Sequence, residues 1–242
     1  MNEEIEQIMN KFNENKKAFT LAEVLITLGI VGIIAAMTIP TVILNNEKLK
    51  TVVALKKAYS TFNQAMIQMA DDYGCTGDLI CTELVKNDHG LVFGEAISQY
   101  FKIVQNCGMD DTQICFASSY ANNFDGSGPV TSGNTGAYRF IDADGMAFRF
   151  FTDYSLDFGA QNMSKTFGSL QVDVNGPAKG PNVQGKDIFT FWLTNGKGPS
   201  LYPQGGIYDD ASPAVTSCTV ANAAGYSCAA RIMENSWQID YY

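Results

Sequence analysis

The chain opens with a polar segment that gives way abruptly to an apolar one. Residues 1–18 hold four glutamates and three lysines, whereas no charged residue occurs from Val24 to Leu44. A helix needs about 20 apolar residues to cross a bilayer, so this run predicts a membrane-spanning helix. An ordinary secretory signal peptide has a shorter apolar core and its small-residue cleavage site after that core. Here the small residue Ala18 precedes the run.

A second apolar pattern follows Pro40, with apolar residues at alternating intervals of three and four. This spacing is typical of one face of an amphipathic helix. Its members are Val52, Leu55, Tyr59, Phe62, Met66, Met69 and Tyr73. We therefore predict one helix from about Phe19 to Asp72, bent at Pro40. Residues 19–44 would form its membrane-spanning half and residues 45–73 a half that packs on a globular domain, residues 74–242.

The globular domain combines helical and strand patterns. Alternating residues at 137–141 and 146–151 flank Asp144-Gly145, a favoured hairpin turn, and 168–174 and 188–193 are further strand candidates. Residues 83–104 predict one or two short helices, residues 106–136 a long surface excursion, and residues 229–235 a short helix. The expected core residues before the strands are Leu84, Val85, Phe93, Ile97, Tyr100 and Phe101. The fold class is thus α+β, with a long N-terminal helix on a mainly antiparallel sheet with long loops.

Composition narrows the function classes. Hydrophobic residues make up 46% of the chain and charged residues 17%, which is enough apolar surface for a folded core. The net charge of -9 argues against general nucleic-acid binding, which requires Lys and Arg to neutralise phosphates. We therefore do not expect nucleic acid as a partner.

The six cysteines fall into three pairs of sequence neighbours. They are Cys75, Cys81, Cys107, Cys115, Cys218 and Cys228. Three local disulfides are the simplest interpretation for a domain outside the cytoplasm, although six cysteines allow fifteen pairings. In a reducing compartment the alternative is free, buried cysteines.

Glu23 is the acidic residue that interrupts the start of the apolar stretch. A carboxylate is costly in lipid and needs a partner, unless it simply lies at the membrane interface. A cut between Ala18 and Phe19 would place a new α-ammonium four residues before Glu23. A neighbouring subunit's ammonium could pair with the same carboxylate.

Residues 16–26, Lys-Lys-Ala-Phe-Thr-Leu-Ala-Glu-Val-Leu-Ile, resemble the start of type IV pilins and type II secretion pseudopilins. The resemblance implies cleavage between Ala18 and Phe19 by a prepilin peptidase and N-methylation of Phe19. It also implies assembly roles for Glu23 and for Pro40, where many members carry a helix-kinking proline. Ala18 departs from the glycine that the family most often has there.

The resemblance further implies a pilin-like fold and a structural subunit of a pilus or pseudopilus, with no catalytic residues and no required cofactor. Its partners would be the prepilin peptidase, other pilin or pseudopilin subunits and, before assembly, membrane lipid. The precursor would cross the bacterial inner membrane once, with the leader 1–18 in the cytoplasm, and then join a cell-surface or periplasmic filament. The alternative is a single-span, membrane-anchored extracytoplasmic binding protein, such as an adhesin or a DNA-uptake minor pilin.

Charge counting alone favours the opposite orientation. The leader has a net charge of -1, whereas Lys48, Lys50, Lys56 and Lys57 follow the apolar run with only Glu47 opposed. Lys16 and Lys17, however, directly abut the span. We therefore follow the resemblance and expect the leader inside.

The sequence offers one candidate metal site and no motif of an enzyme active site. Asp173, Asn175 and Asp187 could converge with backbone carbonyls on a hard cation such as calcium, although the spacing is not that of an EF-hand. The alternative, also for Asp142 and Asp144, is a turn whose side chains cap the local backbone. The sole histidine, His89, lies in Asn-Asp-His-Gly, and the chain has no GxSxG, P-loop or GxGxxG motif. The sequence therefore predicts no enzyme.

Overall fold

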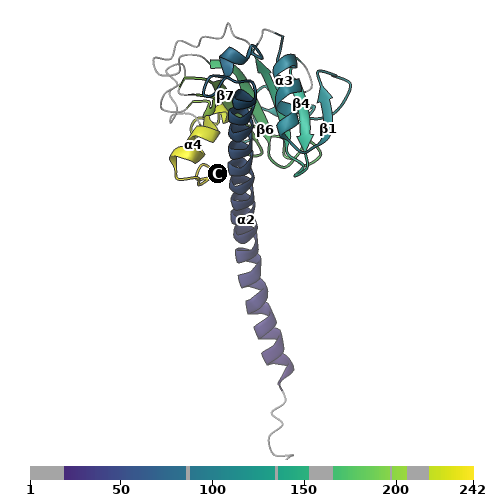
Figure 1. The fold of residues 1–242 in the computed structure, drawn as a ribbon. Coiled ribbons are helices and arrows are strands. Elements are labelled where there is room, and N and C mark those ends of the chain that lie inside the picture. Colours follow the sequence, from purple (N-terminus) through teal and green to yellow (C-terminus); the bar gives the residue numbers. More distant parts are fainter. Residues whose placement is uncertain (1–18, 86–87, 134–135, 153–165, 197, 206–217) are drawn as a thin grey trace, which may run out of the picture. The chain divides into compact units, whose positions relative to one another are not determined.

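A computed structural model describes residues 19–85, 88–133, 136–152, 166–196, 198–205 and 218–242. The chain divides into two compact units, Met1–Glu47 and Lys48–Tyr242. Helix α2 (Leu21–Asp72) contributes residues to both units (Figure 1). Its observed bounds confirm the single long helix that the two apolar patterns predicted.

The part of α2 within Lys48–Tyr242 buries one face. The buried residues are Val52, Leu55, Ala58, Phe62, Ala65, Met66, Met69 and Ala70. Tyr59 packs against the same core while partly exposed. The predicted stripe is wrong at Tyr73, whose side chain is 49% exposed. The helix ends at Asp72, so the helical period no longer determines where Tyr73 points.

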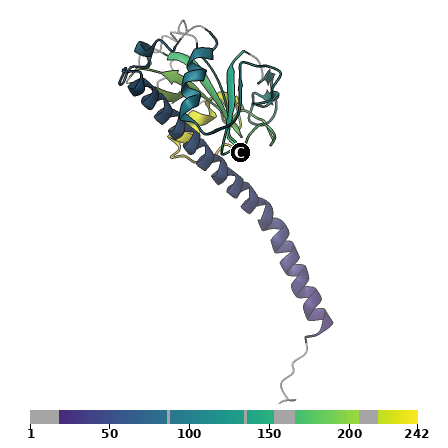
Figure 2. The same cartoon turned by 45° about the vertical axis from the view of Figure 1, so that its right-hand side comes forward.

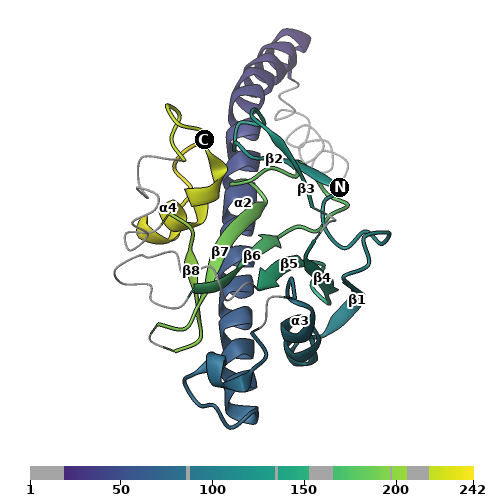
Figure 3. The same cartoon turned by 90° about the horizontal axis from the view of Figure 1, so that it is seen from above.

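The sheet has six antiparallel strands in the order β1-β4-β5-β6-β7-β8. Figure 3 shows these strands side by side in the Lys48–Tyr242 unit. Their bounds are β1 Ile103–Gly108, β4 Tyr138–Asp142, β5 Ala147–Thr152, β6 Thr166–Asp173, β7 Ile188–Thr194 and β8 Ser200–Pro203. The long helix followed by this sheet is the α+β, pilin-like arrangement that the sequence predicted.

The β4–β5 hairpin turns where Asp144-Gly145 predicted it. Phe140 pairs with Phe148 and Tyr138 with Phe150 across the two strands. Asp142 Oδ1 accepts hydrogen bonds from the backbone N–H groups of Asp144 (3.0 Å) and Met146 (2.9 Å). Gly145 has a φ of 82°, a left-handed value that favours glycine. Asp142 therefore fixes the turn, as the turn interpretation predicted.

Aromatic side chains fill the core between the sheet and the helices. The Phe62 ring of α2 lies 5.7–6.0 Å, centroid to centroid, from the rings of Phe101, Phe148 and Phe150. Phe93 of helix α3 (Leu91–Ile97) contacts Phe150 at 5.6 Å. Figure 2 shows the blue, second half of α2 and the teal α3 beside the strands of this unit. These contacts join α2 and α3 to the sheet in one core.

The opposite face of the sheet carries buried and half-buried polar residues in register. Arg139 pairs with Arg149, Arg149 with Gln171, and Gln171 with Thr190. Tyr120, from the two-stranded sheet of β2 (Ser119–Ala121) and β3 (Val130–Ser132), exchanges hydrogen bonds with Gln171. A smaller apolar cluster beside them comprises Phe116, Ala117, Tyr120, Ala147 and Ile188. The sheet is thus covered on both faces.

Two expectations for the region before β4 were wrong. Residues 83–104 do contain α3 and the 3-10 turn η2 (Ser98–Tyr100), but the segment ends in strand β1. Residues 106–136 are not only a surface excursion, since they include β2, β3 and the buried rings of Phe116, Tyr120 and Phe124. β1 is an irregular strand with two register shifts against β4, so it has no clean alternation that a sequence pattern could show.

The six cysteines form three disulfides between sequence neighbours, Cys75–Cys81, Cys107–Cys115 and Cys218–Cys228. This connectivity agrees with the local pairing. Cys75–Cys81 closes a short loop that includes most of the 3-10 turn η1 (Leu79–Thr82). Cys218–Cys228 joins the chain before the turn η3 (Gly225–Ser227) to the first residue of helix α4 (Cys228–Glu234). All three lie within the Lys48–Tyr242 unit.

Candidate functional site

The start of α2 is closed by a reciprocal pair of hydrogen bonds between Thr20 and Glu23. The backbone N–H and the hydroxyl of Thr20 both donate to Glu23 Oε2 at 2.9 Å. Glu23 N–H in turn donates to Thr20 Oγ1 at 3.2 Å. This is a capping box, which satisfies amide groups that the first helical turn leaves unpaired. The Glu23 carboxylate is therefore held at the first turn, next to the residue that follows Phe19.

Apolar side chains surround α2 within the Met1–Glu47 unit. The exposed large ones are Leu21, Val24, Leu25, Ile26, Leu28, Ile30, Val31, Ile33, Ile34, Met37, Ile39, Val42, Ile43 and Leu44. A helix that is apolar on every side is suited to lipid or to the interior of an assembly, because in water it would expose a large apolar area. Of the described residues, only α2 is long and apolar enough to cross a membrane, judged by length and composition.

The predicted processing residues stand at the edge of the described chain. Ala18 lies outside the described residues, and Phe19 is 84% exposed just before α2. Pro40 lies inside α2, which continues through it. Proline has no N–H, so the helix lacks one backbone hydrogen bond there.

Three of the four lysines that follow the apolar run contact aromatic or acidic groups of the folded unit. Lys48 donates to the backbone carbonyl of Tyr242 and lies over its ring. Lys56 lies 5.2 Å from the centroid of the Trp237 ring. Lys57 forms an ion pair of 2.7 Å with Asp144 of the β4–β5 turn. These lysines thus take part in packing within Lys48–Tyr242, a role that charge counting could not reveal.

The loop from β6 to β7 brings together the three residues predicted as metal ligands. Asp173 Oδ1 accepts from the N–H groups of Asn175 (3.3 Å) and Gly176 (2.9 Å). The Asn175 amide nitrogen lies 3.4 Å from Asp187 Oδ2 and 3.2 Å from the carbonyl oxygen of Gly180. Asn175 therefore bridges the two aspartates. This geometry also confirms that the aspartates cap the local backbone, because Asp187 accepts from Asn182 and Val183 at 2.8 and 2.7 Å.

Capping does not use all the oxygen atoms in this loop. Asp173 Oδ2, Asn175 Oδ1 and Asn182 Oδ1 are buried, and none has a hydrogen-bond partner among the described residues. Asp173 and Asp187 are 0% and 2% exposed. Burial, and then the negative charge of Asp187, raise the pKa of Asp173 to about 7. Burial also raises the pKa of Asp187.

Sequence reasoning missed Asn182 and Gly180 as members of this cluster. Both lie between the predicted ligands, and Asn182 has a φ of 54°, so the chain turns there. The signal in the sequence was an additional amide side chain in a Gly- and Pro-rich loop. Across the part of the chain that the structure describes, no group of three or more His, Cys, Asp or Glu could hold a metal. The loop offers two aspartates, and its other oxygens come from amides.

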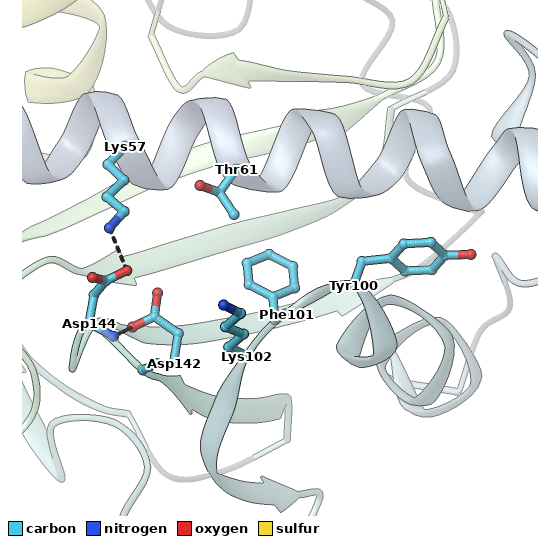
Figure 4. A pocket seen from close by; sticks show the side chains of 8 residues that line it. Lys57, Thr61, Tyr100, Phe101, Lys102, Asp142 and Asp144 are labelled. Carbon is cyan, nitrogen blue, oxygen red and sulfur yellow. Dashed lines mark hydrogen bonds and ion pairs between the residues drawn. The ribbon is translucent and has the colours of Figure 1, made fainter.

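A cavity of about 470 Å³ lies between α2 and the β4–β5 turn of the same unit. Figure 4 shows Lys57 and Asp144 paired at one end and the Tyr100 hydroxyl directed away at the other. That hydroxyl donates to Asp72 Oδ2 at 2.8 Å, and burial raises the pKa of Tyr100 to about 12. Of the charged residues that line the cavity, Lys57 and Asp144 are thus paired with each other. His89 is exposed at a left-handed φ of 60°, as expected for a surface residue.

Together, the apolar helix and the α+β unit that follows it indicate a protein anchored to a membrane through its N-terminal helix. The family model for the prokaryotic N-terminal methylation motif matches residues 14–39. This motif, followed by a long apolar helix, is the signature of type IV pilins and pseudopilins. It indicates a structural subunit, and it implies processing by a prepilin peptidase and assembly with other pilin subunits.

Comparison of the chain with curated proteins gave no match, and comparison with solved structures gave none either. The methylation motif at residues 14–39 is therefore the part of the chain for which a family model supports a functional interpretation. For the other residues, a role can be inferred only from their contacts and burial in the structure.

Proposed function

We propose that this protein is a structural subunit of a type IV pilus or of a type II secretion-type pseudopilus, made as a prepilin. The prepilin peptidase cuts between Ala18 and Phe19, Phe19 is N-methylated, and residues 19–44 then form the contacts between subunits. One observation carries the proposal. The methylation motif, residues 14–39, overlaps the first half of a helix whose apolar side chains there are exposed on every side.

The exposed helix requires two successive environments. Before assembly, lipid covers the apolar side chains of residues 21–44. After extraction from the membrane, the same side chains must be covered by the helices of other copies, because water would not solvate them. Repetition of one subunit contact builds a filament when it does not close into a ring.

Glu23 supports the same mechanism. Its carboxylate is fixed by Thr20 at the first turn of α2. After cleavage before Phe19, the new α-ammonium would belong to Phe19, the residue directly before Thr20. A carboxylate held there is ready to accept an ammonium, its own or that of a neighbouring subunit, and pairing lowers the cost of placing either charge in an apolar assembly.

The disulfides support an extracytoplasmic place for the Lys48–Tyr242 unit. Disulfides persist outside the cytoplasm and are rare within it. All six cysteines of the chain are paired. With this unit outside, the leader 1–18 is in the cytoplasm, where the peptidase would meet its substrate. In this proposal the protein has no enzymatic activity.

Intact-mass and N-terminal analysis of the protein from native membranes and from the sheared surface fraction tests the processing step. We expect a chain that begins at Phe19 and carries one added methyl group. A chain that begins at Met1 in cells with an active prepilin peptidase would contradict the proposal. It would favour the membrane-anchored binding protein instead.

A pair of glutamate variants tests the assembly step. Glu23→Gln removes the charge beside the new N-terminus, so the amount of subunit in the sheared fraction should fall at least tenfold while the membrane level stays the same. Glu47→Gln makes the same chemical change at an exposed position after the apolar run and should assemble like the wild type. Equal assembly of the two variants would exclude the proposed role of Glu23.

A further inference from the structure

Two arginines stand directly opposite each other on the polar face of the sheet. Arg139 of β4 pairs in register with Arg149 of β5, and Figure 3 shows these two strands side by side. Like charges at directly opposite positions destabilise an antiparallel pair. Burial lowers the pKa of Arg149, and the nearby charge of Arg139 adds to this effect. The two guanidinium groups therefore repel each other where water screens them poorly.

Arg139 is the more deeply buried of the two, with a side chain that is 0% exposed. Because side chains alternate along a strand, its face of the sheet also carries Ile141 and, across the pair, Ala147. Ala147 belongs to the smaller apolar cluster, and Ile141 packs against it. A buried cation needs a paired charge and acceptors for its N–H groups. These apolar neighbours supply neither.

Only one of the three side-chain nitrogens of Arg139 has a hydrogen-bond partner in the described part of the chain. Nη2 donates to Asp111 Oδ1 at 3.0 Å, and the Asp111 side chain is 52% exposed. Nε and Nη1 are buried without an acceptor among those residues. Native structures rarely leave buried donors unsatisfied, so these N–H groups call for an acceptor.

The shape of the guanidinium group means that Asp111 cannot be the whole answer. Nε shares one edge of the planar group with Nη2, and Nη1 shares another edge with Nη2. One carboxylate occupies one edge at a time, so even a shift of Asp111 would leave either Nε or Nη1 unsatisfied. A second acceptor is therefore required at the edge that Asp111 leaves open.

A water molecule meets this requirement less well than an anion does. Water brings two protons that need acceptors of their own, and it is neutral. An anion has no proton to place, and its charge offsets the repulsion between the two guanidinium groups. Since Asp111 already supplies one negative charge, a monovalent anion is favoured over sulfate or phosphate.

We propose that Arg139 binds one small monovalent anion, such as chloride, at the edge of its guanidinium that Asp111 leaves open. The charge of Arg149, opposite in register, adds to the attraction. Asp111 lies in the loop closed by the Cys107–Cys115 disulfide, so the anion site is between this loop and the sheet. The bound anion would stabilise the folded unit, because the unfolded chain has no such site.

Thermal unfolding of the full-length protein in detergent tests the proposal. Sodium gluconate is replaced stepwise by sodium chloride at constant ionic strength, so that general screening stays the same. Chloride should raise the midpoint saturably, by about 5–10 °C at about 100-fold above its Kd. Broadening of the chlorine NMR line by the protein should follow the same saturation curve. Equal midpoints in the two salts would overturn the proposal, and so would a rise that does not saturate.

A matched pair of variants locates the anion. Asp111→Asn removes the negative charge that competes with chloride, so the affinity for chloride should rise by about threefold or more. Asp240→Asn makes the same change at the Arg231–Asp240 ion pair, where the aspartate side chain is similarly exposed, and should leave the affinity unchanged. An equal response of the two variants would overturn the assignment to Arg139.

Arg139→Gln removes the buried charge itself. This variant should lose both the chloride-dependent shift and the broadening of the chlorine line. A full chloride response in Arg139→Gln would overturn the site. The Asp111→Asn measurement does not depend on whether Arg139→Gln folds, because it leaves the buried arginine in place.

Discussion

Several aspartates in the loops of this protein accept hydrogen bonds from backbone N–H groups and so hold the local backbone in place. Asp88 caps the start of α3, Asp110 and Asp142 hold turns, and Asp187 binds two successive N–H groups. Asp173 differs, because one of its oxygens is buried with no donor among the described residues. Local capping therefore accounts for one oxygen of Asp173 and leaves the other without a donor. This difference between chemically identical side chains comes from the burial of Asp173 in the sheet.

The cap of α3 gives a prediction at a single residue. Asp88 accepts from the N–H groups of Gly90, Leu91 and Val92 at 3.0–3.1 Å, and so satisfies amides that a short helix cannot. Asp88→Ala should lower the free energy of unfolding by about 0.5–2 kcal/mol. Glu95→Ala, on the exposed face of the same helix, should change it by less than about 0.5 kcal/mol. Denaturant unfolding followed by tryptophan fluorescence measures both, and equal losses would exclude the cap.

Asp110 gives a prediction for pH. Hydrogen bonds from the Thr112 hydroxyl (2.6 Å) and from Gln113 lower the pKa of Asp110 to about 2. A lowered pKa in the folded state means that Asp110 stabilises the turn above its ordinary pKa of 3.8 and loses this effect as the pH falls towards 2. Carboxyl chemical shifts recorded by NMR against pH should show this titration. A midpoint near 3.8 would contradict the geometry of the turn.

At the scale of elements, α2 is one helix with two chemically different halves. Within Met1–Glu47 its large apolar side chains are exposed, whereas within Lys48–Tyr242 eight of its residues are buried. The second half is amphipathic, so its stability comes from packing one face on a core. The exposed half has no such core in a single subunit. Its stability must therefore come from lipid or from other helices.

Adjacent residues of the second half provide a matched test of this packing. Met66 is fully buried in the core and Ile67 is 48% exposed. Met66→Ala should lower the free energy of unfolding of the Lys48–Tyr242 unit by about 2–5 kcal/mol, because it leaves a cavity. Ile67→Ala should change it by no more than about 0.5 kcal/mol. The measurement is denaturant unfolding in detergent; comparable losses at both positions would show that the helix face is assigned wrongly.

Elements with a strict period were predictable, and irregular ones were not. The three-four spacing gave α2, and the alternation around Asp144-Gly145 gave β4 and β5. β2, β3 and β8 are only three or four residues long, which is too short for alternation to appear. Each is recognised only by its pairing with a neighbouring strand, as when Leu201 of β8 pairs with Leu193 of β7.

The candidate sites also differ in how far the sequence could predict them. The start of α2 could be predicted because its motif is contiguous, with Phe19, Thr20 and Glu23 within one helical turn. The sequence also indicated Asp173, Asn175 and Asp187, because they occupy one loop. It could not show that Asp173 lies between Ala147 and Ile188 in a buried sheet. That burial leaves its oxygen without a donor, and burial depends on the fold of distant segments.

At the scale of the whole molecule, the proposed function assigns the two units to two environments. Lys48–Tyr242 contains all three disulfides, and Met1–Glu47 contains the proposed leader and the apolar half of α2. Lysines on the far side of the span contact Tyr242, Trp237 and Asp144 within the folded unit. These contacts within the folded unit therefore explain why lysines are concentrated directly after the apolar run. Lys16 and Lys17, directly before the span, are the charges consistent with a cytoplasmic leader.

The state of the cysteines in living cells tests this arrangement. If Lys48–Tyr242 folds outside the cytoplasm, alkylation before reduction should add nothing to the intact mass, and alkylation after reduction should add six groups, one for each cysteine. The double variant Cys218→Ser/Cys228→Ser should add four after reduction and none before, because the two other disulfides are separate from it. Its free energy of unfolding should fall by about 2–4 kcal/mol, since the unfolded chain loses one constraint. Alkylation of the unreduced wild-type protein from cells would place the unit in a reducing compartment, and the proposed orientation would be wrong.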